Sequence, residues 1–134
     1  MQELESVLFA NEAFYAAFAT GDVDAMEDLW MTGRSVSCIH PGWNAMHGRD
    51  IIMKTWRDIL KEESPEVRCM GAEAYLATDN AAVVTCYELV GKSVLAATNI
   101  FVRDGNRWRI VHHQAGPATV AMQAETTPGK NTIN

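Results

Sequence analysis

Hydrophobic residues in the first half of the chain recur at intervals of three and four, the spacing that gathers them on one side of a helix. The first stripe consists of Leu4, Val7, Leu8, Phe14, Tyr15 and Phe18. Gly21 favours a left-handed exit from this helix, and Asp22 can cap a second helix over about 23–30. We predict a third helix capped by Asp50 and ended by Ser64 and Pro65. Its apolar side would hold Ile52, Trp56, Ile59 and Leu60.

Short apolar runs replace the helical spacing around position 36 and again after position 65. The first predicts a strand over 36–40 that ends at Pro41 and Gly42. Four further strands are predicted, with turn residues between them, over 66–77, 81–91, 94–103 and 107–115. Such short connections make antiparallel hairpins. We therefore expect an α+β fold, a curved antiparallel sheet wrapped around the N-terminal helices.

One domain over 1–125 accounts for all of these elements, and the polar segment 126–134, which lacks periodicity, is expected to be a flexible tail. The net charge of −6 argues against nucleic acid and membrane surfaces as partners, since both require clustered lysine and arginine. The acidic start "MQELES" is unlike a signal peptide. We therefore expect a cytoplasmic protein whose three cysteines are reduced thiols.

Several stretches resemble the nuclear transport factor 2-like superfamily, in particular its SnoaL-like members. They are "AFATGDVDAMEDLW", "SCIHPGW…GRDIIMKTW", "VTCYE", "ATNIFVRDGNRWRIVHH" and the closing "AGP". The resemblance covers about residues 4–117, and the elements follow the expected order. It implies a cone of sheet and helices around an internal pocket. The family includes isomerases, polyketide cyclases, dehydratases, hydrolases and non-enzymatic assembly domains, so the fold alone does not define the chemistry.

Alternation along the strands predicts which side chains share a face. Val36, Cys38 and His40 form one such set. In the last strand, Arg109, Val111, His113 and Ala115 are predicted to oppose Trp108, Ile110, His112 and Gln114. The two adjacent histidines then lie on opposite sides of the sheet. The resemblance implies that the inner face holds His113, Ala115, Asn99, Phe101, Thr85 and Tyr87, which would place Glu88 at an interface or in solvent.

His40 and Asn99 are the predicted catalytic pair. By resemblance, His40 matches the proton-shuttling carboxylate of the ketosteroid isomerase branch, and Asn99 matches its oxyanion donor. We therefore predict His40 as general base and Asn99 as polarising donor. The sequence departs from that branch at Phe14, which stands in place of its catalytic tyrosine, and Tyr15 is expected to point elsewhere. A structural role for His40, capping the strand end, is the alternative.

An aromatic wall is predicted to hold the ligand. The predicted ligand-binding residues are Phe18, Trp43, Trp56, Thr85, Tyr87, Phe101 and His113. Trp43 follows the Pro-Gly break and is expected at the pocket rim, while His47 is expected on a surface loop. Structural roles in the core are the alternative for the large rings.

Cys38, His40 and His113 are the residues that come nearest to a zinc set, yet they lack a fourth ligand and a recognisable spacing. We therefore predict no metal and no other cofactor. A nucleophilic role for the Cys38–His40 pair is also disfavoured, because the sequence shows no third group to orient the imidazole.

Three function classes remain open. The first is a cofactor-independent isomerase, cyclase or dehydratase that moves a proton on a small apolar carbonyl compound. The second is a non-catalytic module that binds a small apolar or acidic molecule, and the third is a dimeric assembly module. In every case we expect a homodimer through the outer sheet face, where Trp108 and Ile110 would be too apolar for water.

Overall fold

The computed structural model describes residues 2–62 and 66–119. The helices are α1 (Gln2–Thr20), α2 (Val23–Leu29) and α3 (Arg49–Lys61). The strands are β1 (Ser37–Ile39), β2 (Met46–His47), β3 (Val67–Thr78), β4 (Ala81–Val90), β5 (Ser93–Asp104) and β6 (Arg107–Pro117). The predicted terminator at 64–65, the domain boundary at 125 and the tail 126–134 lie outside the described residues. Within the described ranges, no helix is both long and apolar enough to cross a bilayer.

The two helix starts differ in how they are capped. Asp22 caps α2 as predicted, because its Oδ1 accepts a hydrogen bond from the backbone N–H of Ala25 at 3.1 Å. The predicted cap of α3 was wrong. The cap position is Gly48, with a φ of 102° and no side-chain hydrogen bond, and Asp50 lies inside the first turn. Its carboxylate suits the positive end of the helix dipole there.

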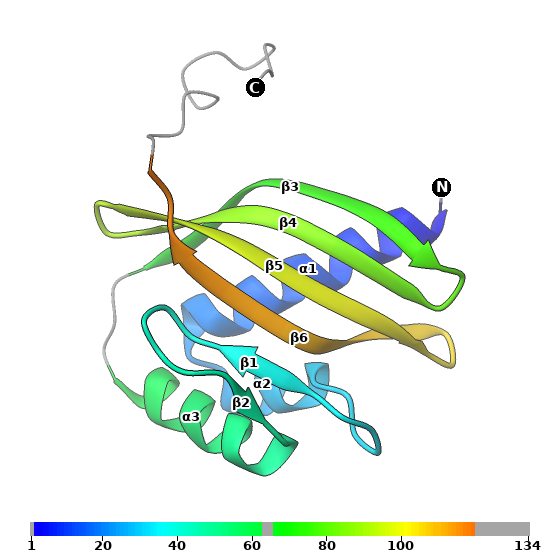
Figure 1. Cartoon of the computed structure of the whole chain (residues 1–134), viewed down its shortest axis with the longest axis horizontal. Helices are drawn as coiled ribbons and strands as arrows, with labels where there is room; N and C mark the ends of the chain where they lie inside the picture. The colour runs from blue at the N-terminus through cyan, green and yellow to red at the C-terminus, as the bar shows by residue number, and fades with distance from the viewer. Residues whose placement is uncertain (1, 63–65, 120–134) are drawn as a thin grey trace.

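The sheet has the strand order β2-β1-β6-β5-β4-β3. The β1–β6 pair is parallel and the remaining pairs are antiparallel, so the expectation of antiparallel pairs alone fails at this one position. Figure 1 shows the four long strands curving across α1, with α2 and α3 beside β1 and β2. The α+β architecture with helices inside a curved sheet is therefore confirmed. Strand β2, which is only two residues long, was not predicted.

The face assignment of β4 was wrong. Thr85 and Tyr87 are exposed, Tyr87 at 39%, whereas Cys86 and Glu88 point inward and are 3% and 2% exposed. The cross-strand partner of buried Asn99 is Val84, which fixes the inner set of β4 as the even-numbered residues. Glu88 makes the even-numbered residues of β4 look polar by hydropathy, although this face of the strand is buried.

A β-bulge in β6 overturns the predicted outer face of that strand. Ile100 pairs with His112 but Phe101 pairs with Ile110, which leaves Val111 as an extra residue. Trp108 and Ile110 are consequently buried, on the same side as His113, and Arg109 and Val111 are not on that side. Beyond the bulge the prediction is confirmed. His113 and Ala115 point inward, and His112 lies on the other face, bonded to Ser37.

Candidate functional site

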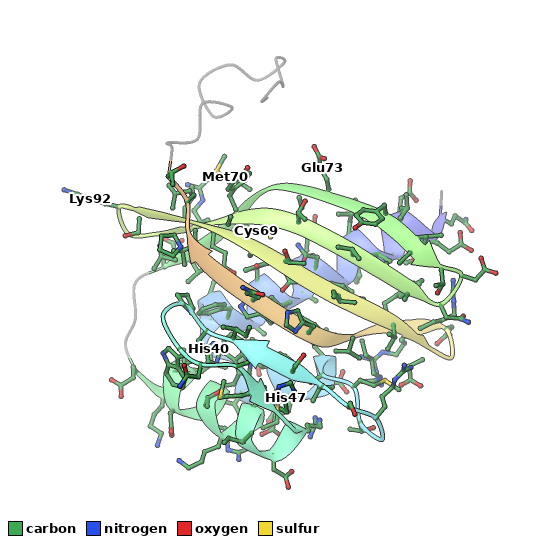
Figure 2. All side chains as sticks on the ribbon, viewed as in Figure 1. His40, His47, Cys69, Met70, Glu73 and Lys92 are labelled. Atoms are coloured by element: carbon green, nitrogen blue, oxygen red, sulfur yellow. The ribbon has the colours of Figure 1, made fainter. Side chains whose placement is uncertain are left out.

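His40 lies immediately after β1 and is buried against α3, as Figure 2 shows. It shares the inner face with Val36 and Cys38, as alternation predicts, and both of these residues are buried. The loop that follows turns away at Pro41, and Trp43 then covers the imidazole edge-on at a centroid distance of 4.9 Å. Trp43 is itself 50% exposed. Its predicted position at the rim of a ligand pocket stays a prediction.

The hydrogen bonds of Thr55 determine the tautomer of His40. Thr55 Oγ1 donates to the backbone carbonyl of Ile52 at 2.7 Å, so its oxygen can only accept from the imidazole. The bond of 2.9 Å between His40 Nε2 and Thr55 Oγ1 therefore places the proton on Nε2. His40 Nδ1 is left as an unprotonated nitrogen, 3.9 Å from Cys38 Sγ. The ring is thus oriented as a neutral base.

Aromatic rings from α1 and α3 surround the two inner histidines. Trp56 of α3 contacts His40 at a centroid distance of 4.9 Å and His113 at 5.8 Å. Phe14 contacts Trp56 at 5.6 Å and His113 at 5.0 Å, and Phe18 contacts Trp56 at 5.0 Å. We call these five residues, His40, His113, Trp56, Phe14 and Phe18, the histidine–aromatic cluster. Its low polarity suits a largely apolar molecule.

Trp56 contributes an unsatisfied donor to this cluster. Its side chain is 1% exposed, and its indole Nε1–H has no hydrogen-bond partner within residues 2–62 and 66–119. In the same described ranges Trp30 Nε1 and Arg49 Nε also lack partners, but neither residue belongs to the cluster. An unpaired buried N–H carries a desolvation cost of about 1–3 kcal/mol. A ligand oxygen that accepted this hydrogen would recover that cost.

Asn99 sits beside the cluster as the hub of a buried hydrogen-bond network. Its Nδ2 donates to Asn11 Oδ1 at 2.9 Å and to the Tyr15 hydroxyl at 3.2 Å. Its Oδ1 lies 2.6 Å from His113 Nδ1, so that nitrogen carries the proton and donates. Both amide hydrogens of Asn99 are thus in use in this structure. Its predicted role as polarising donor stays a prediction, which requires one of these bonds to open.

Tyr15 connects the network to Glu88, against the expectation for both residues. The hydroxyl of Tyr15 donates to Glu88 Oε2 at 2.7 Å and accepts a hydrogen bond from Cys86 Sγ at 3.4 Å. Glu88 Oε2 lies 3.9 Å from His113 Nε2, the unprotonated nitrogen of that ring. Neighbouring Phe14 and Tyr15 are both buried, because the sheet curves around a wide arc of α1. A tyrosine is therefore present in the site.

Burial sets the protonation states of these groups. It lowers the pKa of His40 to about 4. Burial, followed by the nearby charges of His40 and His112, lowers the pKa of His113 to about 3. Burial also raises the pKa of Glu88, against the opposing hydrogen bond from Tyr15, and the pKa of Tyr15 itself. A pKa of about 3 keeps His113 neutral at neutral pH, so the Glu88–His113 contact is not an ion pair there.

These shifts predict that stability falls on acidification. The histidine pKa values are lower in the folded state than the ordinary 6.5, so the unfolded chain binds protons first as the pH drops. The free energy of unfolding is constant above about pH 6.5. Below that pH it falls until the pH reaches the pKa of the folded state, by up to about 1.4 kcal/mol per pH unit for each histidine. Glu88 opposes this loss. Because its pKa is raised in the folded state, the folded protein binds this proton before the unfolded chain does as the pH falls.

Urea unfolding between about pH 7.5 and pH 5 would measure this dependence. The variant His40→Gln should flatten the curve by at least the contribution of one histidine, because the charge of His40 also lowers the pKa of His113. A wild-type free energy of unfolding that stays constant across this pH range would contradict the burial of neutral histidines.

The remaining predicted residues are distributed as follows. Phe101 is buried opposite Ile110. Thr85 and Tyr87 lie on the outer face, so they could contact only a partner bound there. His47 is exposed, though it belongs to β2 and not to a loop. Asn11, Tyr15, Glu88 and Thr55 are site residues that the sequence analysis missed.

The predicted absence of a metal stays a prediction. Across residues 2–62 and 66–119, no three histidine, cysteine, aspartate or glutamate side chains are gathered as they would be around a metal ion. Burial, together with the charge of Glu88, raises the pKa of Cys38 to about 12. At neutral pH this residue is therefore a thiol and not a nucleophilic thiolate.

Comparison with known proteins places this geometry in a family. The structure superimposes with a TM-score of 0.78 on a candidate dehydratase of the NTF2-like family from Streptomyces avermitilis, with 28% sequence identity over 89% of this chain and 98% of that one. An uncharacterised protein with a cystatin-like fold from Caulobacter vibrioides gives a TM-score of 0.74 at 14% identity, covering 92% of this chain and 94% of that one. The second likeness concerns the fold alone.

A curated relative is the F-box protein SKIP8 of Arabidopsis thaliana, 24% identical over 112 residues and 82% of this chain. The chain spans about half of that relative's length, 48%. The sequence model of the SnoaL-like domain matches residues 7–119, the stretch that holds all of α2, α3 and the sheet. The chain therefore belongs to the SnoaL-like domain family.

Proposed function

We propose that this protein catalyses cofactor-independent proton transfer on a small, neutral, largely apolar carbonyl compound, either isomerising it or eliminating water from it. The observation that carries the proposal is the pairing of His40 and Trp56. An unprotonated imidazole nitrogen and an unpartnered indole N–H belong to rings whose centroids are 4.9 Å apart, in a buried aromatic setting. A base and a hydrogen-bond donor are what enolate formation requires.

The residues then take separate roles. His40 Nδ1 would accept the proton from the carbon beside the carbonyl, and Trp56 Nε1–H would stabilise the developing oxyanion. Asn99 would hold His113 and Tyr15 in place through its three hydrogen bonds. In an elimination, a neutral Glu88 or the Tyr15 hydroxyl could protonate the leaving oxygen. Burial raises the pKa of both groups, which favours their protonated forms.

Charge defines the substrate class. The buried polar or charged side chains among the described residues are Asn11, His40, Glu88, Asn99 and His113, a set without lysine or arginine. A carboxylate or phosphate on the substrate would therefore lack a cationic partner and would be repelled if Glu88 ionised. Of the two predicted kinds of ligand, a small apolar molecule is therefore favoured over an acidic one. The similarity of this structure to the candidate dehydratase from Streptomyces avermitilis supports the elimination of water as the reaction.

The test uses 4-hydroxy-4-phenylbutan-2-one, a neutral aromatic β-hydroxy ketone, in D₂O. Exchange of the hydrogens beside its carbonyl is followed by NMR, and formation of the conjugated enone by absorbance. We expect both to exceed the buffer rate for the wild-type protein and for His47→Ala, and to return to background in His40→Ala. Exchange at the buffer rate for this ketone and a panel of neutral ketones would contradict the proposal and would favour a binding or assembly module.

The exposed outer face of the sheet supports an assembly role in addition. Tyr75 is 57% exposed and Tyr87 39% exposed on this face. Tyr87 also borders a groove of about 420 Å³ that is lined by Thr85, Ala96, Thr98, Gln114 and Pro117, among others. Exposed tyrosines beside a groove with a neutral lining are typical of a protein interface. We propose that a second copy of the chain covers this face, with at least about 1,000 Å² buried in the contact.

Light scattering at micromolar concentration should accordingly give twice the chain mass of 14.8 kDa. Tyr87→Glu should shift the protein towards the monomer, because it places a charge in the apolar contact. Phe9→Glu is the matched control, since Phe9 is 71% exposed on α1, away from the outer face, and this variant should remain dimeric. A wild-type mass of 14.8 kDa would reject the dimer.

A further inference from the structure

Two cysteines of neighbouring strands meet on the inner face of the sheet. Cys69 of β3 pairs across the ladder with Glu88, and Cys86 lies two residues from Glu88 on the same face of β4. The register shifts between Met70 and Glu73, next to this pair, where the β3 backbone adopts a φ of 66° at Gly71. Cys69 therefore shares the inner face of the sheet with Glu88 and Cys86.

Each of the two thiols is hydrogen-bonded to a polar side chain of α1. Asn11 Nδ2 donates to Cys69 Sγ at 3.7 Å. Cys69 and Cys86 occupy diagonal positions on the inner face of β3 and β4, a spacing at which side chains of neighbouring strands approach each other. Cys86 Sγ then donates to the Tyr15 hydroxyl at 3.4 Å, and Tyr15 donates to Glu88. The two thiols therefore lie near each other, held by Asn11 and Tyr15, which are one turn apart on α1.

Exposure differs between the two thiols. Cys69 is partly exposed, whereas Cys86 is 3% exposed, and all three cysteines of the chain are unpaired thiols in this structure. An oxidant from solvent would consequently reach Cys69 first. Cys86 is the neighbouring thiol on the same inner face, so it can attack an oxidised Cys69. Cys38 is fully buried and bonds to neither thiol, so it has no part in this reaction.

We propose that Cys69 and Cys86 form an oxidation site that hydrogen peroxide converts into an intramolecular disulfide. In the first step Cys69 sulfur takes one oxygen atom, which gives a sulfenic acid and releases water. In the second step the Cys86 thiolate attacks that sulfur, the S–S bond forms, and the hydroxyl departs as water with the proton of Cys86. Two thiols and one peroxide thus give one disulfide and two waters.

Oxidation would alter the network beside the proposed catalytic site. The Cys86 S–H that now donates to Tyr15 is lost in the disulfide, and so is the Cys69 S–H. Tyr15 would keep its hydrogen bonds with Asn99 and Glu88. The disulfide itself does not depend on any activity of the protein, so its test is independent of the proposed function.

Peptide mass analysis can test the site directly, because trypsin releases both cysteines in one peptide, residues 69–92, and Cys38 in another, residues 35–49. The reduced, folded protein is treated with hydrogen peroxide, denatured, alkylated and digested. We expect peptide 69–92 to lack both alkyl groups and to be about 2 Da lighter than its fully reduced form, while peptide 35–49 remains alkylated. Reduction before alkylation should restore both groups.

The variant Cys86→Ser should abolish the mass loss, and Cys38→Ser should retain it. Two results would overturn the proposal. One is a peptide 69–92 that carries two alkyl groups after a peroxide treatment that oxidises the methionines. The other is a Cys69 that proceeds to sulfinic acid, or links to a second chain, while Cys86 in the same wild-type protein remains alkylated.

Discussion

Replacing Asn99 with alanine will lower the free energy of unfolding by about 3–5 kcal/mol, the largest single effect on stability that we expect. Asn99 is 0% exposed and serves three partners, Asn11, Tyr15 and His113. Its removal leaves the Nδ1–H of His113 without an acceptor and deprives Asn11 and Tyr15 of a donor. Each unsatisfied buried group costs about 1–3 kcal/mol, partly offset by any water that enters the new cavity.

Urea unfolding at neutral pH, followed by circular dichroism, measures this cost. The matched control is Asn44→Ala, at an exposed loop position, which should change stability by less than about 0.5 kcal/mol. A loss below about 1 kcal/mol for Asn99→Ala would mean that the network contributes little. The account of Asn99 as the residue that holds Tyr15 and His113 would then be wrong.

Replacing His40 with alanine should reduce turnover by about 10²-fold or more, the largest effect on activity that we expect. Its imidazole is held by Thr55, is packed against Trp43 and Trp56, and presents an unprotonated Nδ1. A pKa of about 4 keeps this base unprotonated at neutral pH. Removing it leaves the donor but no base, so turnover should fall much more than substrate binding does.

The ketone exchange assay described above gives this comparison, with stability measured in parallel to confirm that the variant folds. Thr55→Val is a second variant, which keeps the imidazole but removes its tautomer-fixing partner, and we expect an intermediate loss. His47→Ala should match the wild-type protein. Full activity in His40→Ala would remove His40 from the mechanism and would leave His113 as the remaining buried imidazole.

Local sequence patterns predicted much of the fold. Helical spacing gave the helices, turn residues gave the hairpins, and alternation correctly placed His40 and Cys38 on one face and separated His112 from His113. Two features were beyond these patterns. A strand as short as β2 leaves no periodicity to detect, and a bulge changes the facing of a strand midway without any turn residue to mark it.

The burial of Glu88 in the site was not predicted, for a different reason. Hydropathy places a glutamate outside, yet Glu88 is buried because Tyr15 and His113 lie beside it, a long-range arrangement that strand periodicity does not encode. One local signal was available. Asn11 and Tyr15 are four residues apart in α1 and so share a face, which puts two polar groups in an otherwise apolar stripe. Such a pair indicates a buried polar network.

We expect His40 and His113 to be neutral, buried bases with fixed and opposite tautomers. Nitrogen-15 NMR of histidine-labelled protein, recorded across a pH titration, reports both the tautomer and the pKa of each ring. The account predicts a proton on Nε2 of His40 and on Nδ1 of His113, with neither ring titrating until the pH approaches about 4, the pKa that burial gives His40. Either ring titrating near pH 6.5, or showing rapid exchange between tautomers, would contradict it.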